Sequence, residues 1–129
     1  NNRSQIIKTN ANTILLDAYN SNPMSLEKAI QNLENIKHKN KVMILGDMFE
    51  LGEETYIEHQ KIIDQCLKSG VSNVFLVGKI FNAINNTKYT SFDNTTDLVE
   101  LLKTQAIEDA FILIKGSRGM KLEQVVDCL

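Results

Sequence analysis

Short apolar runs that end in polar or glycine-containing loops alternate with longer amphipathic stretches along this chain. A run of four or five continuously apolar residues is typical of a strand that is covered on both faces. An amphipathic stretch of ten or more residues is typical of a helix that covers such a strand. This alternation predicts βαβ units and a mostly parallel sheet. The predicted strands are residues 13–16, 42–45, 74–77, 89–92 and 111–114, with an added edge strand at 5–9.

Apolar side chains recur at helical spacing between these runs. Asn22 and Pro23 predict the start of the first long helix, and Gly70 predicts the end of the second. A short helix is expected at 80–84. The fold class that follows is a Rossmann-like three-layer α/β sandwich, with a mostly parallel sheet of five to six strands and helices on both faces. The apolar stripes of the longer helices are Leu26, Ala29, Ile30 and Leu33; Ile57, Ile62, Ile63, Cys66 and Leu67; Leu98, Leu101 and Leu102; and, in a final helix, Leu122, Val125, Val126 and Leu129.

Charge and hydropathy exclude several classes of partner. The chain has 129 residues, of which 14 are Lys or Arg and 16 are Asp or Glu, so its formal charge is −2. That balance offers no basic surface to nucleic acid or to an anionic membrane. The apolar runs are far too short to cross a bilayer, and the polar residues 1–12 do not resemble a signal peptide. We therefore expect neither a nucleic acid partner nor a membrane partner.

The two cysteines indicate the redox compartment of the protein, and the first residue indicates whether the chain is a fragment. Cys66 and Cys128 lie among apolar neighbours and share no short spacing of the kind that binds zinc. We expect two reduced core thiols in a cytoplasmic protein and no metal site. The sequence starts at Asn1 without an initiator Met, so we expect a fragment or a processed chain in which residues 1–129 form a single domain.

The glycines mark the edge of the sheet where a site is expected. Parallel sheets bind ligands outside the carboxyl ends of their strands, near the point where the strand order reverses. The single proline, Pro23, follows the first of the buried strands. Five of the six glycines lie in loops after predicted strand ends, namely Gly46, Gly52, Gly78, Gly116 and Gly119.

The first such loop, residues 17–23, reads D-A-Y-N-S-N-P. The carboxylate of Asp17 can accept hydrogen bonds from ribose hydroxyls or hold the water of a cation. The side-chain amides of Asn20 and Asn22 can pair with the polar edge of a ligand. The same residue types are common in a turn that leads into a capped helix. Both interpretations are open from the residues alone.

The second loop, residues 46–52, reads G-D-M-F-E-L-G. Asp47 and Glu50 can position a cation, a cationic partner or a substrate amine. Alternatively, the loop is solvated and leads into a helix whose positive N-terminus is favoured by the acidic residues 53–54. His59 lies in that helix and suits a packing or surface position as well as a site.

The last loop, residues 115–121, reads K-G-S-R-G-M-K. Backbone N–H groups near a helix start, beside Lys115 and Arg118, form an anion site, and the alternative is a basic helix cap. A guanidinium suits a carboxylate or phosphate because it binds in a bidentate fork. The GxxxxGK[ST] and GxGxxG patterns do not occur in the sequence, which argues against an autonomous nucleotide hydrolase or dehydrogenase.

Together the three loops resemble the C-terminal domain of the Mur ligases, and within them the members that add D-alanyl-D-alanine to UDP-N-acetylmuramoyl-tripeptide. The order and spacing of the motifs agree over nearly the whole chain. Ser and Leu stand at two positions where the family usually has Ala and Met. The family patterns D-x-Y-N-A-N-P-x-S-M, G-D-M-x-E-L-G with a later His, and K-G-S-R correspond to residues 17–26, residues 46–52 with His59, and residues 115–118.

This resemblance implies one domain of an ATP-dependent ligase of cytoplasmic peptidoglycan precursor synthesis, and hence of cell wall biogenesis, cell shape and division. An N-terminal domain would hold the UDP-sugar, and a central domain would carry the P-loop, the catalytic lysine and the ligands of Mg²⁺. This domain, with residues 1–5 as interdomain linker, would close over them and contact ATP and the dipeptide; alone it would be inactive and hold no cofactor. The implied nucleotide-binding residues are Arg3, Asp17, Tyr19, Asn20 and Asn22, and the implied substrate-binding residues are Asp47, Glu50, His59, Lys115, Ser117 and Arg118.

A stand-alone binding module of the receiver or flavodoxin type is the alternative. Asp17 would then be a phospho-acceptor, with Lys115 as its partner. That class also requires a second acidic pair at a strand end. The strand predicted at 74–77 is followed by Gly78 and Lys79 instead, which disfavours the alternative.

Overall fold

Six strands form one sheet in the order β1-β2-β6-β3-β4-β5 in the computed structural model, which describes residues 4–84, 86 and 88–129. β1 is antiparallel to β2, and every other neighbouring pair is parallel. The mostly parallel sheet predicted from the apolar runs is confirmed. The strands are β1 (Gln5–Lys8), β2 (Asn12–Asp17), β3 (Lys41–Gly46), β4 (Asn73–Val77), β5 (Thr90–Phe92) and β6 (Ala110–Lys115).

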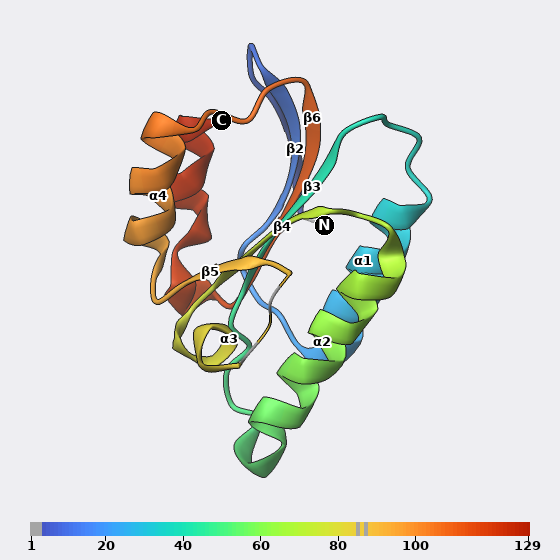
Figure 1. Ribbon diagram of the computed structural model, residues 1–129, viewed down its shortest axis with the longest axis vertical. Coiled ribbons are helices and arrows are strands. Elements are labelled where there is room, and N and C mark those ends of the chain that lie inside the picture. The colour runs from blue at the N-terminus through green and yellow to red at the C-terminus, as the bar shows by residue number, and fades with distance from the viewer. Residues whose placement is uncertain (1–3, 85, 87) are drawn as a thin grey trace.

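Helices cover both faces of this sheet (Figure 1). On one face lie α1 (Pro23–Glu34) and α2 (Thr55–Ser69), and on the other lie α4 (Thr95–Thr104) and the 3₁₀ helix η3 (Leu122–Cys128). The short α3 (Lys79–Ala83) follows the carboxyl end of β4. Two three-residue 3₁₀ turns, η1 (Gly52–Glu54) and η2 (Arg118–Met120), complete the connections. The three-layer sandwich is therefore confirmed.

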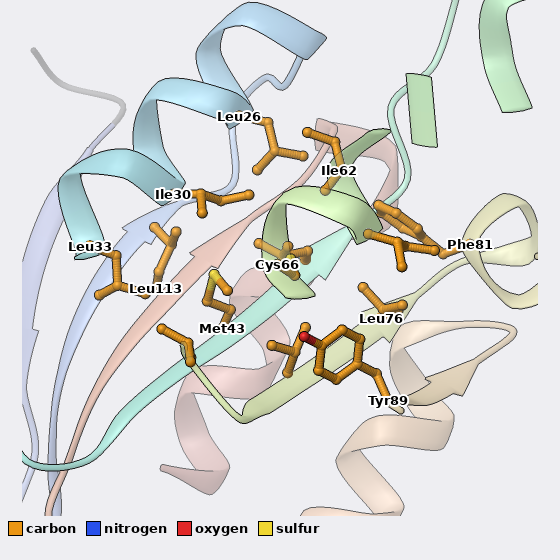
Figure 2. Packing of buried hydrophobic residues seen from close by; sticks show 14 of the residues in the cluster. Leu26, Ile30, Leu33, Met43, Ile62, Cys66, Leu76, Phe81, Tyr89 and Leu113 are labelled. Atoms are coloured by element: carbon orange, nitrogen blue, oxygen red, sulfur yellow. The ribbon is translucent and has the colours of Figure 1, made fainter. Parts of the chain in front are cut away.

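Alternate residues of the central strands feed two separate cores. In β3, Met43 and Leu45 face α1 and α2, whereas Val42 and Ile44 face α4 and η3. All four are fully buried, which explains why residues 42–45 are continuously apolar. Figure 2 shows the first core, in which side chains from α1 and α2 meet those of the sheet, together with Phe81 of α3. With both faces covered, the domain is expected to unfold cooperatively by itself.

The local start and stop signals act as predicted. Asn22 caps α1: its side chain accepts the N–H of Ser25, the Ser25 hydroxyl accepts the N–H of Asn22, and Pro23 occupies the first helical position. Gly70 ends α2 in the left-handed conformation with φ of 79°. The alternative that treats Asn22 and Pro23 as a helix cap is thus confirmed by geometry.

Two helical stripes differ from prediction. Ile57 and Leu67 of α2 are 59% and 52% exposed, because the buried side of α2 runs through His59, Ile62, Ile63 and Cys66 instead. The final helix is 3₁₀ rather than α-helical: the N–H of Leu129 bonds the carbonyl of Val126, three residues back. Spacings of three residues between apolar positions suit a 3₁₀ helix as well as an α-helix.

Both cysteines are free thiols. Burial raises the pKa of the Cys66 thiol to about 12, so that thiol is an inert packing group. Cys128 is only half-buried, and the core position predicted for it is therefore only partly reached. No helix among the described residues is long and apolar enough to span a bilayer.

Candidate functional site

At the carboxyl end of the sheet, the loop after β6 leads to one face and the loops after its two neighbouring strands lead to the other face. β6 lies between β2 and β3, whose following loops lead to α1 and α2 on one face. The loop after β6 leads to η3 on the other face. A crevice at such a switch point is the usual ligand site of an open α/β sheet. The three loops selected from the sequence therefore meet at one edge. Their approach is close: a Cβ atom on Gly116 would lie 3.0 Å from the Cα of Gly46.

A buried lysine joins the first loop to the last strand. Lys115 is only 2% exposed, and its Nζ lies 2.9 Å from Oδ2 of Asp17 and 3.0 Å from the carbonyl oxygen of Asn20. Asp17 and Lys115 are register partners on adjacent strands, which brings the two side chains together. The ammonium expected at an open anion site is thus directed into the protein. A contact of Lys115 with a ligand stays a prediction.

The rest of the first loop is partly engaged in its own turn. Asn20 accepts the N–H of Ser21 through its side-chain oxygen, and the Asn22 side chain caps α1. Tyr19 is 38% exposed at the edge. Nucleotide contacts by Asp17, Tyr19, Asn20 and Asn22 stay predictions, and the same prediction for Arg3 lies outside the described residues.

One hydroxyl of this loop is buried without a partner. Ser21 is 4% exposed, and its Oγ makes no hydrogen bond within the described part of the chain. An orphaned buried hydroxyl costs about 1–3 kcal/mol, and alanine removes it without adding volume. Ser21→Ala is expected to stabilise the domain by about 1 kcal/mol in urea unfolding. The matched control is Ser25→Ala, which breaks the capping box and is expected to destabilise. A less stable Ser21→Ala variant would contradict the prediction.

Asp47 of the second loop clamps the start of α3. Its carboxylate accepts the N–H of Ile80 at 2.9 Å and of Phe81 at 3.0 Å. Burial raises the pKa of Asp47, and the two hydrogen bonds act in the opposite direction. The carboxylate is therefore occupied by the protein itself. A direct role of Asp47 toward substrate stays a prediction.

His59 is a fully buried residue of α2. Its Nε2 accepts the N–H of Met48 at 3.0 Å, so Nδ1 carries the proton and donates to the carbonyl of Thr55 at 2.6 Å. The ring also packs edge-on against Phe81, with centroids 4.6 Å apart. Burial lowers the pKa of the imidazole, despite the opposing effects of Thr55 and Asp47. These contacts make His59 a support for the second loop, and its contact with substrate stays a prediction.

We expect the buried neutral His59 to make the domain less stable at acidic pH. Its pKa in the folded state lies below the unfolded value of about 6.5, so the unfolded chain binds more protons below that pH. The free energy of unfolding is expected to fall as pH falls from 7 to 5.5, by up to about 1.4 kcal/mol per unit. In His59→Gln the domain is expected to be less stable at pH 7 and less dependent on pH. Urea unfolding at both pH values measures this, and equal pH slopes for the two proteins would contradict it.

The last loop is tied to the second and stacked on the first. Ser117 is buried, donates its N–H to the carbonyl of Asp47, and accepts the N–H of Phe49 through Oγ. The exposed Arg118 places its guanidinium carbon 4.6 Å from the centre of the Tyr19 ring. Ser117 is thus engaged within the chain, whereas Arg118 is a cation at the surface of the edge.

The predicted helix start in the last loop is not an α-helix. After Ser117 the chain forms η2 and then η3, separated by Lys121 in the left-handed conformation with φ of 55°. The N–H groups of Met120 and Lys121 bond carbonyls within the turn. A 3₁₀ turn of three residues aligns few peptide dipoles, so an anion would be held by side chains rather than by a helix N-terminus.

A cavity of about 300 Å³ opens beside these loops. Phe49, Ile80 and Met120 give it apolar walls. Lys79 and Asp93, whose charged atoms are 3.9 Å apart, add polar groups. Sequence reasoning missed Lys79, Asp93, Asn94 and Thr95, although the D-N-T sequence after β5 is the same kind of signal as the other loops.

Glu50 is exposed in the second loop, with φ of 64°, and its contact with substrate stays a prediction.

A larger groove of about 660 Å³ lies between α1 and α2, and its lining includes Pro23 but none of the residues predicted above to bind nucleotide or substrate. Within residues 4–84, 86 and 88–129, no group of three His, Cys, Asp or Glu side chains is arranged to hold a metal ion. The candidate site is the carboxyl edge of the sheet, because the three motif loops meet there and the cavity of about 300 Å³ opens beside them.

Residues 2–118 match the family described as "Mur ligase, glutamate ligase domain". The UDP-N-acetylmuramoyl-tripeptide–D-alanyl-D-alanine ligases of Buchnera aphidicola (subsp. Baizongia pistaciae) and Bacillus subtilis are 37% and 35% identical to the chain over 99% and 96% of its length. The chain spans about 29% of each of these relatives.

Solved structures agree with the fold. MurF ligase from Thermotoga maritima in complex with ADP superposes with a TM-score of 0.81 at 22% identity, over 98% of this chain and 30% of that one. A MurF structure from Acinetobacter baumannii gives 0.79 at 26% identity, over 97% of this chain and 29% of that one.

Proposed function

This chain belongs to the Mur ligase family, as a glutamate ligase domain, and we propose that it is the C-terminal domain of an ATP-dependent ligase that adds D-alanyl-D-alanine to UDP-N-acetylmuramoyl-tripeptide. The observation that carries the proposal is the meeting of its three motif loops at the carboxyl edge of β2, β3 and β6. The receiver-like alternative is not favoured, because β4 ends at Val77 and is followed by Gly78 and Lys79, without an acidic pair. The product would serve peptidoglycan synthesis in the cytoplasm.

The proposed partners are the other domains of the same ligase. An N-terminal domain would bind the UDP-sugar, and a central domain would bind ATP and Mg²⁺; bound ATP would activate the tripeptide carboxylate. The donor set of this domain does not suit Mg²⁺ itself: the Asp17 carboxylate pairs with Lys115, and the Asp47 carboxylate accepts two N–H groups of α3. The role of this domain is to bind and orient the attacking dipeptide when the domains close.

The cavity beside the loops suits the dipeptide. D-Alanyl-D-alanine is a small zwitterion with two methyl groups, and the cavity combines apolar walls with charged residues. Arg118, which directly precedes the lining residues Gly119 and Met120, would hold the carboxylate in a bidentate fork. Asp93 would orient the amine; its carboxylate is held by Asn82 at 2.7 Å. Orientation of the amine toward the activated carboxylate is the catalytic contribution that such a domain makes.

The test is a ligation assay with the full-length protein that contains this chain. We expect amide formation and release of ADP that depend on both D-alanyl-D-alanine and the UDP-linked tripeptide. The isolated 129-residue chain is expected to turn over no ATP, since the sequence contains no phosphate-binding loop. Full-length protein that forms ADP with a single amino acid in place of the dipeptide, or none with either, would overturn the proposal.

A further inference from the structure

The exposed guanidinium of Arg118 rests on the ring of Tyr19, which belongs to a loop about a hundred residues away in sequence. We propose that Tyr19 is a positioning residue for Arg118: its ring holds the guanidinium in the orientation that receives the carboxylate of the incoming dipeptide. The proposal rests on the proposed function. It gives Tyr19 a task different from the nucleotide contact that the family resemblance implies.

Arg118 needs such a support because of where it stands. It is the first residue of the three-residue turn η2, and its side chain is exposed. A long, exposed arginine samples many rotamers, and binding a ligand in a bidentate fork restricts it to one of them at a cost in conformational entropy. An aromatic face at 4.6 Å restricts the guanidinium while leaving its N–H edge available to a carboxylate.

The backbone on both sides of Tyr19 is anchored, so its ring is a suitable platform. Lys115 holds the side chain of Asp17 and the carbonyl oxygen of Asn20, which flank Tyr19 in the loop. The Lys115 side chain is almost completely buried and that of Asp17 is 22% exposed, so this clamp is partly shielded from solvent. The pairing of β2 with β6 then fixes the loop of Tyr19 relative to that of Arg118. The ion pair of Asp17 and Lys115 thus positions the loop that carries the Tyr19 ring beneath Arg118.

The experiment compares Tyr19→Leu and Tyr19→Phe in the full-length ligase. Leucine removes the aromatic face, whereas phenylalanine keeps it and removes only the hydroxyl. An exposed cation–π contact is worth a factor of about two to five, so Tyr19→Leu is expected to raise KM for D-alanyl-D-alanine by that factor. We expect Tyr19→Phe to retain the wild-type value, and the KM for ATP to change in neither variant.

A double-mutant cycle shows whether Tyr19 acts through Arg118. In an Arg118→Ala background, Tyr19→Leu is expected to cause no further rise in KM for the dipeptide. The proposal would be overturned if Tyr19→Leu raised the KM for the dipeptide by the same factor with and without Arg118. It would also be overturned if the KM for ATP rose rather than that for the dipeptide. A melting temperature shared by all variants separates positioning from misfolding. Absence of dipeptide ligation by the wild-type ligase would count against the proposed function instead.

Discussion

Gly78→Ala is expected to destabilise the domain by more than about 4 kcal/mol, out of a total of about 5–15 kcal/mol for a domain of this kind. Gly78 has φ of 127°, which an L side chain rarely adopts, and this alone costs about 1–3 kcal/mol. An added Cβ would overlap the carboxylate of Asp47. That carboxylate would have to move away from the buried N–H of Phe81 and the part-buried N–H of Ile80, and a buried donor without a partner costs about 1–3 kcal/mol.

Thermal unfolding measures this effect, and a fall in melting temperature of more than about 10 °C is expected. Gly70→Ala is the matched control, since Gly70 also has a positive φ but has open space around its Cβ position. Only the conformational cost of about 1–2 kcal/mol for an L residue in the left-handed region applies there. If the two substitutions destabilise equally, the clamp of Asp47 on α3 does not have the importance assigned to it.

Arg118→Lys in the full-length ligase is expected to lower kcat/KM for D-alanyl-D-alanine by roughly ten- to a hundredfold. The charge is kept, but a lysine makes point contacts where a guanidinium makes two parallel hydrogen bonds. A lost charge-assisted bond corresponds to about 1.5–3 kcal/mol. If the contact is equally strong in the ground and transition states, the loss appears mainly as a raised KM. Fold stability is expected to change little, because the side chain is exposed.

Steady-state kinetics with varied dipeptide, together with a melting curve, measure this effect. Lys79→Met is the comparison variant, because Lys79 is a cation that lines the cavity itself, whereas Arg118 directly precedes the lining residues Gly119 and Met120. If Lys79→Met raises the KM for the dipeptide and Arg118→Lys does not, the carboxylate lies on the other side of the cavity. A large fall in the melting temperature of Arg118→Lys would make Arg118 a structural residue.

The strands and the sandwich could be predicted because their signals are local. Val42 and Ile44 face one core and Met43 and Leu45 the other, so residues 42–45 form a continuous apolar run that is recognisable without its neighbours. The cap formed by Asn22 and the left-handed Gly70 are likewise set by residues close in sequence. Such signals survive in a single sequence because each describes one segment.

The partners within the site could not be predicted, because they depend on strand order. The family resemblance assigns Asp17 and Lys115 to different ligands, and only the disfavoured receiver-like alternative places them together. They pair because β6 inserts next to β2. The carboxylate of Asp47 accepts hydrogen bonds from the start of α3, and nothing in the sequence indicates that these two segments are in contact. His59 likewise has its partner in the backbone of Met48, a contact that no spacing indicates.

The most direct measurement replaces the C-terminal domain of the Bacillus subtilis relative, which is 35% identical, with residues 1–129 of this chain. The chimera is assayed for addition of D-alanyl-D-alanine to UDP-N-acetylmuramoyl-tripeptide, beside the same relative without any C-terminal domain. We predict that the chimera forms the amide, that the truncated protein does not, and that Arg118→Ala in the chimera weakens use of the dipeptide. A chimera that folds and binds ATP but joins no dipeptide would contradict the assignment of this chain to the dipeptide-adding ligases.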